Sequence, residues 1–330
     1  MIKSVNSVRK TTFSIFIAFV FSVSIFLFIM SVMPDYVYLE HKEFYSQDLP
    51  GKKIFIIGSS HVYALNPTII TNDLVENGYN YTVYNLGQGS FDAEERLRTV
   101  DFIISQEPKV VVYGIAYQTF YSHGRNIAEN PPESFPSPTK LEDLLSTVQI
   151  PFNIGLLDNP KFATINTFNH FYQKQTGVFQ EEPKRPWSNT PFFIRSGETE
   201  IVPDPKDLEK DGKLANYKGN EIYPLNKNRT YSALKELIHN LHDNDIKVVI
   251  FTTPHLKNWL TQVPEQQKEI FNSMLDDLEK EFNFEVFRLH DKYQSLDIWT
   301  DHDHLLSHNE KTDFYSEEIA KMLITKIDEQ

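Results

Sequence analysis

The chain has 330 residues, of which 40% are hydrophobic and 13% aromatic, so it can bury a sizeable core and is not expected to be disordered. Its formal net charge of −13 argues against a protein that mainly binds nucleic acid, because phosphate binding requires a basic face. It contains no cysteine, which excludes thiolate nucleophiles, iron–sulfur clusters and cysteine-ligated zinc.

Residues 1–34 predict a cytoplasmic tip and a membrane anchor. Lys3, Arg9 and Lys10 precede an apolar run at residues 11–33 that carries no charge. A helix of this length can cross a hydrocarbon core of about 30 Å. Basic residues on the N-terminal side place the N-terminus in the cytoplasm and the rest of the chain outside. A cleaved signal peptide is the alternative, although its apolar stretch is usually shorter.

After a polar linker at residues 35–50, short apolar runs alternate with amphipathic stretches throughout residues 51–330. Near-continuous aliphatic runs between helices are typical of parallel strands covered on both faces. We therefore expect an α/β chain, a three-layer α/β/α sandwich with about five parallel strands. The predicted strands are 53–57, 81–86, 109–115, 246–252 and 284–289, and the predicted helices are 67–76, 92–105, 231–243, 265–282 and 311–327.

This alternation is interrupted between about residues 118 and 228, where prolines cluster among scattered aromatic residues. The segment is too long for a simple loop, so we expect an insertion with helices of its own, one of them at 141–147. Its sequence indicates no particular chemistry.

Polar residues and glycines follow each predicted strand. In a parallel sheet with right-handed crossovers, the carboxyl ends of all strands lie at one edge, and ligands bind there. The groups expected at this edge are Gly58-Ser59-Ser60-His61, Asn85 to Ser90, Gly114 to Gln118, Thr252 to His255 and Asp301 to His304.

Ser60, His304 and Asp301 are the residue types of a nucleophilic triad. A serine nucleophile needs a base within hydrogen-bond reach and an acid that orients the base. The Asp-x-x-His spacing lets Asp301 hold the His304 imidazole, and the Ser60 turn directs its own amide toward the site. Gly87 or Gly89 can bring a second amide close to an oxyanion, since a glycine has no Cβ.

Other polar residues at the same edge receive lesser roles. Asp303 is a rival of Asp301 for orienting His304. His61 is interpreted as a turn or supporting residue rather than a catalytic one. The candidates for a substrate pocket are His61, Tyr117, Gln118 and His255.

A metal site is the alternative interpretation of residues 301–308, which contain three histidines and two aspartates. Such side chains ligate zinc or manganese. No second ligand cluster stands out at another strand end, where His255 and His290-Asp291 are the only candidates. We therefore predict neither a metal nor another cofactor.

Three of these groups resemble the conserved blocks of the SGNH (GDSL-type) hydrolase superfamily: Gly58-Ser59-Ser60, Asn85-x-Gly87-x-Gly89 and Asp301-x-x-His304. The resemblance covers about residues 50–125 and 230–328, and it implies a flavodoxin-like fold. It also implies that Ser60 is the nucleophile, that Asp301 and His304 supply the acid and base, and that Gly89, or else Gly87, donates to the oxyanion hole.

The chain departs from the family pattern at two positions. Ser59 stands where the family usually has Asp. Ala116 and Tyr117 follow the third strand where the family usually offers an Asn, so the third oxyanion donor is missing or is replaced by Gln118 or a main-chain group.

The D-alanyl transfer protein of teichoic acid synthesis has a similar Gly-Ser-Ser block, and SGNH domains fused to membrane acyltransferases often have a His after the serine, as His61 is here. The resemblance thus implies a membrane-anchored, extracytoplasmic serine esterase or O-acyltransferase. Its expected substrate is an acylated cell-envelope glycan, a polymer or a small ester, and its expected partners are the bilayer and a multi-spanning membrane acyltransferase. The alternatives are a non-catalytic SGNH-fold envelope binding protein and a metal-dependent hydrolase.

Overall fold

The computed structural model describes residues 17, 19–22, 24, 36–89, 91–121, 187–192, 203, 204, 206, 208 and 221–328. The chain divides into two compact units, residues 1–41 with 136–180 and residues 42–135 with 181–330. Most of the predicted anchor and the helix expected at 141–147 lie outside the described residues. Within the described part of the chain, no helix has both the length and the apolar composition to span a bilayer.

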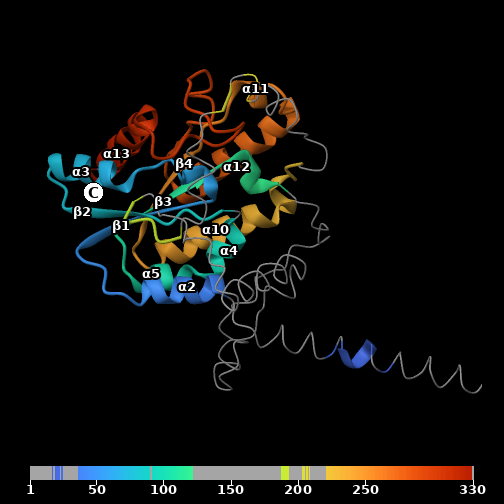
Figure 1. Cartoon of the computed structure of the whole chain (residues 1–330), viewed down its shortest axis with the longest axis horizontal. Coiled ribbons are helices and arrows are strands. Elements are labelled where there is room, and N and C mark those ends of the chain that lie inside the picture. The colour runs from blue at the N-terminus through green and yellow to red at the C-terminus, as the bar shows by residue number, and fades with distance from the viewer. Residues whose placement is uncertain are drawn as a thin grey trace, which may run out of the picture. The chain divides into compact units, whose positions relative to one another are not determined.

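Five parallel strands form a single sheet in the second unit, in the order β2-β1-β3-β4-β5 (Figure 1). Aligned runs of aliphatic residues pair across it; Ile54, for example, lies opposite Val83 on one side and Val110 on the other. The predicted α/β fold with about five parallel strands is confirmed. The strands are β1 (Lys52–Ile57), β2 (Tyr81–Asn85), β3 (Val110–Ile115), β4 (Lys247–Thr252) and β5 (Val286–Phe287).

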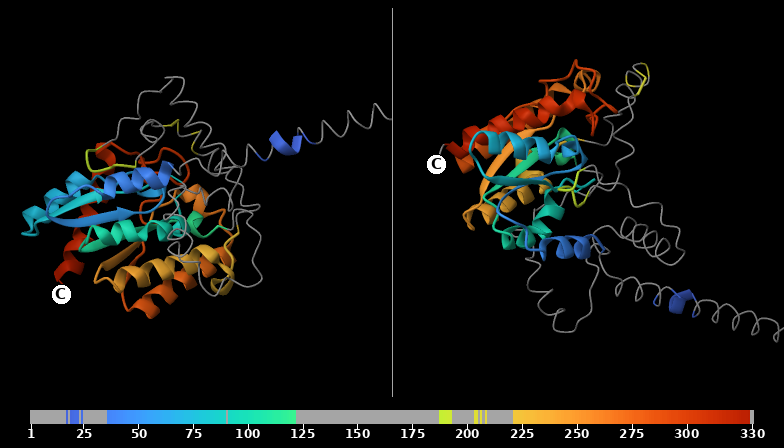
Figure 2. Two further views of the ribbon diagram at one scale, coloured as in Figure 1. Left: turned by 90° about the horizontal axis from the view of Figure 1, so that it is seen from below. Right: turned by 60° about the vertical axis from the view of Figure 1, so that its left-hand side comes forward.

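Helices cover both faces of this sheet (Figures 1 and 2). On one face, Ile54 and Ile56 pack in a cluster with residues of α3 and α13; on the other, Phe55 and Ile57 pack with residues of α5, α10 and α12. The helices are α2 (Tyr36–Tyr45), α3 (Pro67–Glu76), α4 (Ala93–Arg98), α5 (Val100–Ser105), α10 (Arg229–His242), α11 (Lys257–Leu260), α12 (Glu265–Phe282) and α13 (Asp313–Asp328), with short 3-10 turns η1 (Ser60–Val62), η2 (Tyr117–Phe120), η3 (Leu225–Lys227) and η4 (Glu310–Thr312).

Two elements differ from the sequence prediction. The helix predicted at 92–105 is broken into α4 and α5 at Thr99, whose hydroxyl donates to the carbonyl of Arg96 (3.2 Å) and thereby competes with the helical pattern. Strand β5 is shorter than predicted, because the amides of Leu289 and His290 donate to the Thr252 hydroxyl instead of continuing the ladder.

The segment expected as a linker at residues 35–50 contains helix α2. Tyr45 and Leu49 are 3% and 8% exposed, and both belong to the core on the α10 side of the sheet. The side chain of Gln106 donates to the carbonyls of Tyr45 and Gln47 and so ties this segment to the end of α5. From residue 42 onward the segment is therefore part of the folded unit rather than a spacer.

Part of the expected insertion also returns to the core. The amide of Asn85 donates to the Asn189 carbonyl (2.8 Å), and the Asn189 side chain donates to the Val83 carbonyl (3.1 Å), so this segment lies along β2. Phe192 is fully buried, with its ring centroid 5.4 Å from that of Phe44. Residues 187–192 thus complete the core instead of forming a separate module.

We expect Phe192→Ala to lower the free energy of unfolding by about 3–5 kcal/mol, because a large buried ring leaves a cavity. Leu296→Ala is the matched control: Leu296 is a large apolar residue that is 45% exposed, and its loss should cost within about 0.5 kcal/mol. Urea denaturation of the full-length chain measures both. Equal effects of the two substitutions would contradict the burial of residues 187–192.

The Val62 side chain packs the turn after β1 against the ends of three strands. A Cβ added to Gly87 or Gly114 would lie 2.5 Å or 2.3 Å from a Val62 methyl group, and one added to Gly58 would lie 2.9 Å from it. Only glycine leaves room for Val62 at these three strand ends. The packing brings the residues just before Val62, including Ser60, to the carboxyl edge of the sheet.

Candidate active site

Ser60 is the first residue of η1 and lies three residues beyond Ile57, the last residue of β1. Its Oγ is 2.7 Å from Nε2 of His304, which is 244 positions away in the chain. The guanidinium of Arg96, itself fully buried, donates to the carbonyls of Gly58 (3.0 Å) and Leu86, and thereby ties together the loops that follow β1 and β2. The predicted serine and histidine therefore meet at the expected edge of the sheet.

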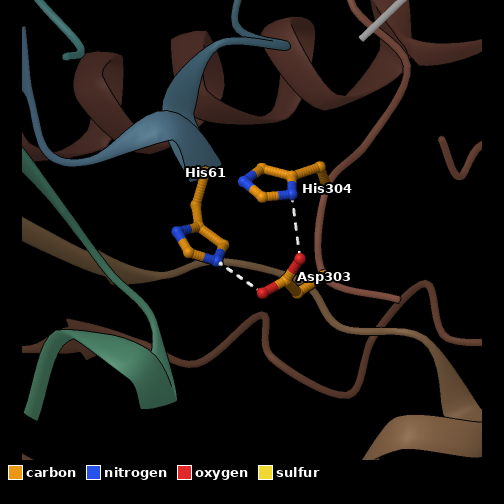
Figure 3. Close-up of side chains that lie close together, drawn as sticks. All are labelled: His61, Asp303 and His304. Atoms are coloured by element: carbon orange, nitrogen blue, oxygen red, sulfur yellow. Dashed lines mark hydrogen bonds and ion pairs between the residues drawn. The ribbon is translucent and has the colours of Figure 1, made fainter. Parts of the chain in front are cut away.

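Two carboxylates contact the other nitrogen of His304. Nδ1 lies 2.8 Å from Asp301 Oδ2 and 2.8 Å from Asp303 Oδ1. Asp301 Oδ1 also accepts the amides of Asp303 (2.9 Å) and His304 (2.7 Å), so the local turn fixes the orientation of its carboxylate. The structure brings Ser60, His304 and Asp301 together. It also places Asp303 as a second acid on the same imidazole, and Figure 3 shows this contact between Asp303 and His304.

These charges determine the protonation of His304. Burial lowers the pKa of His304, but the charge of Asp303 and the hydrogen bonds that the imidazole donates to both carboxylates outweigh burial and raise the pKa well above its ordinary value. Burial conversely raises the pKa of Asp303, but His304 and His61 lower it well below the ordinary value. Asp303 is therefore a buried anion that favours the imidazolium form of His304.

Asp303 also connects the triad to a group of buried polar residues. Its Oδ2 lies 3.3 Å from Nε2 of His61 and accepts a hydrogen bond from Nε2 of Gln118 (2.6 Å). The other end of the Gln118 amide, Oε1, is 2.9 Å from Nε2 of His255. Nδ1 of His61 is in turn 2.7 Å from the Ser59 hydroxyl. Five polar side chains thus form one connected network with Asp303 at its centre.

The residues predicted to line a substrate pocket lie mostly behind the site. Tyr117 and His255 are no more than 1% exposed; Tyr117 stacks on Phe271 with centroids 4.0 Å apart, and His255 stacks on Trp259 at 4.6 Å. His61 is buried as well. Gln118 is half-buried, and both ends of its amide are bonded within the network. Tyr117 and His255 therefore support the site from the core and do not face a substrate.

Of the three amides predicted to donate to an oxyanion, one already has an acceptor and two have none within the described part of the chain. The amide of Gly87 donates to the side chain of Asn85 (3.0 Å), so Gly87 is not available for an oxyanion. Among the described residues, the amides of Ser60 and Gly89 have no hydrogen-bond acceptor. The amide of Gln88 donates to the Gly58 carbonyl (3.1 Å), which holds the Gly89 loop against the Ser60 turn. Ser60 and Gly89 are therefore the candidate donors.

A metal is poorly matched to this donor set. Among the described residues, two groups could offer ligands: His61, Asp303 and His304, and Asp301, His302 and Asp303. However, the rings of His61 and His304 stack with centroids 4.7 Å apart and planes inclined by 17°. An imidazole lone pair lies in the plane of its ring, so two stacked, nearly parallel rings do not direct their nitrogens at one ion.

A hollow of about 490 Å³ lies elsewhere among the described residues. It is lined by Phe287, Lys292, Tyr293, Phe314, Lys321 and Met322, among others, and by no member of the Asp303 network. We place the candidate functional site at Ser60, where a hydroxyl contacts an imidazole.

No protein-family model matches the chain, and no curated protein matches it. Among solved structures, the crystal structure of an acetyl xylan esterase is similar with a TM-score of 0.39 and 14% sequence identity, over 83% of this chain and 99% of the esterase. At this similarity the activity of that enzyme does not carry over to the chain.

Proposed function

We propose that the chain is a serine ester hydrolase or O-acyltransferase of the SGNH type, with Ser60 as its nucleophile. The observation that carries the proposal is the 2.7 Å contact between Ser60 Oγ and His304 Nε2, with carboxylates on the opposite nitrogen of the ring. A hydroxyl, a base within hydrogen-bond reach and an acid that orients the base are the requirements of nucleophilic acyl transfer.

In the proposed reaction, Ser60 Oγ attacks the carbonyl carbon of an ester and His304 Nε2 takes the hydroxyl proton. Asp301 and Asp303 stabilise the imidazolium that forms. The amides of Ser60 and Gly89 hold the negative charge of the tetrahedral intermediate. The proton then passes from His304 to the departing oxygen, and an acyl-Ser60 ester remains. Water or a sugar hydroxyl, deprotonated by the same nitrogen, releases the acyl group.

We further propose that this site acts outside the cell on acylated envelope glycans or polymers, from a chain anchored by its N-terminal apolar run. The support is the uncharged stretch at residues 11–33 that follows three basic residues. A multi-spanning membrane acyltransferase is the proposed partner, because it would supply acyl groups at the same membrane. Retention of the full-length chain in the membrane fraction after a carbonate wash tests the anchor.

A fluorophosphonate probe tests the catalytic proposal directly. We expect the full-length chain to form a covalent adduct at Ser60, and we expect His304→Gln to slow its formation by a factor on the order of 10² or more, because the variant lacks the general base. Peptide mapping by mass spectrometry identifies the labelled residue. A folded chain that shows no adduct at Ser60 at either neutral or alkaline pH contradicts the assignment, because the base is neutral above its pKa.

A non-catalytic envelope binding protein with the same fold is the second candidate. The observation that favours it is the scarcity of oxyanion donors: the Gln118 amide is directed at Asp303, and the Gly87 amide is directed at Asn85. Such a protein would bind its ligand without forming an adduct, so the probe experiment distinguishes the two candidates.

A further inference from the structure

We propose that Ser59 is a second nucleophilic serine, with His61 as its base and Asp303 as the acid that orients His61. It would accept an acyl group, or a phosphonyl group from a probe, from the same class of activated esters as Ser60. The class of acyl donor is taken from the proposed function. The arrangement of Ser59, His61 and Asp303 is independent of that proposal.

The three side chains are connected as a nucleophilic relay requires. Ser59 Oγ lies 2.7 Å from His61 Nδ1, and His61 Nε2 lies 3.3 Å from Asp303 Oδ2. Compared with Ser60 and His304, the two ring nitrogens exchange roles, because the serine contacts Nδ1 of His61 but Nε2 of His304. Either nitrogen of an imidazole can accept a proton while the other donates to a carboxylate.

The two relays lie side by side and converge on one carboxylate. The rings of His61 and His304 are stacked with centroids 4.7 Å apart. Asp303 directs Oδ1 toward His304 and Oδ2 toward His61, as Figure 3 shows. Each ring therefore has a serine hydroxyl at one end and Asp303 at the other. This arrangement places two hydroxyls of one turn on two bases that share an acid.

The surroundings of His61 keep it in the form that a base needs. His61 is 8% exposed, and burial lowers its pKa, against the opposing effect of the hydrogen bond to Asp303. A neutral His61 that donates Nε2–H to Asp303 has its Nδ1 lone pair directed at the Ser59 hydroxyl. Ser59 itself is only half-buried, so a small electrophile can approach it.

The proposed step is an ordinary acyl transfer. Ser59 Oγ forms a bond to the carbonyl carbon as its proton moves to His61 Nδ1. The bond to the leaving oxygen then breaks, and that oxygen takes the proton from His61. The products are an acyl-Ser59 ester and a free alcohol. Water or an acceptor hydroxyl, deprotonated by His61, completes the cycle.

The test is fluorophosphonate labelling of Ser60→Ala in the full-length chain, with tandem mass spectrometry to separate the adjacent serines. We expect an adduct at Ser59, and we expect Ser60→Ala combined with His61→Gln to label more slowly by a factor on the order of 10². Ser105 is the internal control, because its exposed hydroxyl donates to the Phe102 carbonyl and contacts no imidazole; it should remain unlabelled.

Two results of this labelling experiment would overturn the proposed role of Ser59. An adduct at Ser60 in the wild-type chain but none at Ser59 in Ser60→Ala, with unchanged circular dichroism, overturns this inference and leaves the proposed function intact. Labelling of Ser59 that His61→Gln does not slow overturns it as well. If Ser60→Ala does not fold, Asp301→Asn replaces it: Asp301 contacts His304 but has no hydrogen bond with His61 among the described residues, so the ratio of Ser59 to Ser60 adducts should rise.

Discussion

Replacing Ser60 with alanine is expected to lower kcat/KM for p-nitrophenyl acetate by a factor on the order of 10³ or more. The variant removes the hydroxyl that lies 2.7 Å from His304 and leaves the rest of the network in place. Hydrolysis followed at the absorbance of p-nitrophenolate measures the loss. Any residual rate that disappears on further replacement of His61 would come from Ser59.

The control for this experiment is Ser105→Ala. Ser105 is an exposed serine at the end of α5, so its loss should leave the rate and the thermal midpoint nearly unchanged. Ser60→Ala should also keep the midpoint of the parent, because its side chain is not part of the apolar core. Full activity in a folded Ser60→Ala chain would remove Ser60 from the mechanism.

The second large effect concerns the two acids on His304. Because Asp301 and Asp303 both contact Nδ1, either one can hold the ring when the other is neutralised. We expect Asp301→Asn and Asp303→Asn each to lower kcat by about 10- to 100-fold, and the double variant to lower it by about 10⁴-fold. A double variant no worse than Asp301→Asn would show that Asp303 does not act on His304.

The two carboxylates should also determine how kcat/KM depends on pH. His304 accepts the Ser60 proton only when it is neutral. Burial lowers its pKa, but the carboxylates raise it well above the ordinary value, so activity is lost as the pH falls through that raised pKa. Removing one negative charge lowers the pKa, so the acid limb of kcat/KM should move to lower pH in Asp303→Asn. A limb that stays in place, or moves upward, would contradict the assignment of Asp303 as an anion beside the base.

Much of this fold follows from apolar patterning. The buried runs around Ile54, Val83, Val111 and Val249 predicted four strands to within about a residue, because parallel strands covered on both faces are apolar almost throughout. The break at Thr99 could not be predicted, since a single hydroxyl that turns back on its own helix leaves the hydrophobic pattern unchanged.

The contribution of residues 187–192 to the core was equally inaccessible, because Phe192 reaches the core through contacts that no local periodicity encodes. In the site, residue type and strand topology were sufficient to predict that Ser60, Asp301 and His304 would meet. They did not reveal the direction of each side chain. The Asp-x-x-His spacing favoured Asp301 over Asp303 as the acid, and only the structure shows that both contact Nδ1.

The sequence Ser59-Ser60-His61 places a second serine next to a histidine. It does not show that Asp303 contacts that histidine, and this contact is what suggests the role proposed for Ser59. Gly87 illustrates the opposite case. Its position in the second block suggested a hydrogen-bond donor to an oxyanion, whereas its amide is bonded to Asn85 and its missing side chain accommodates Val62. Arg96 gave no signal at all, because nothing in its helix distinguishes a buried arginine from an exposed one.

Val62 also determines how the Ser60 turn can respond to a bound molecule. Its methyl groups fill the space beside Gly58, Gly87 and Gly114, so packing against three strand ends holds the turn in place. A nucleophile and amide donors that are already in place need little reorganisation when charge develops on an ester oxygen. If Ser60 is the nucleophile as proposed, an ester substrate would fit a site that is already formed, and we expect discrimination among acyl donors to come from parts of the chain that Val62 does not hold in place.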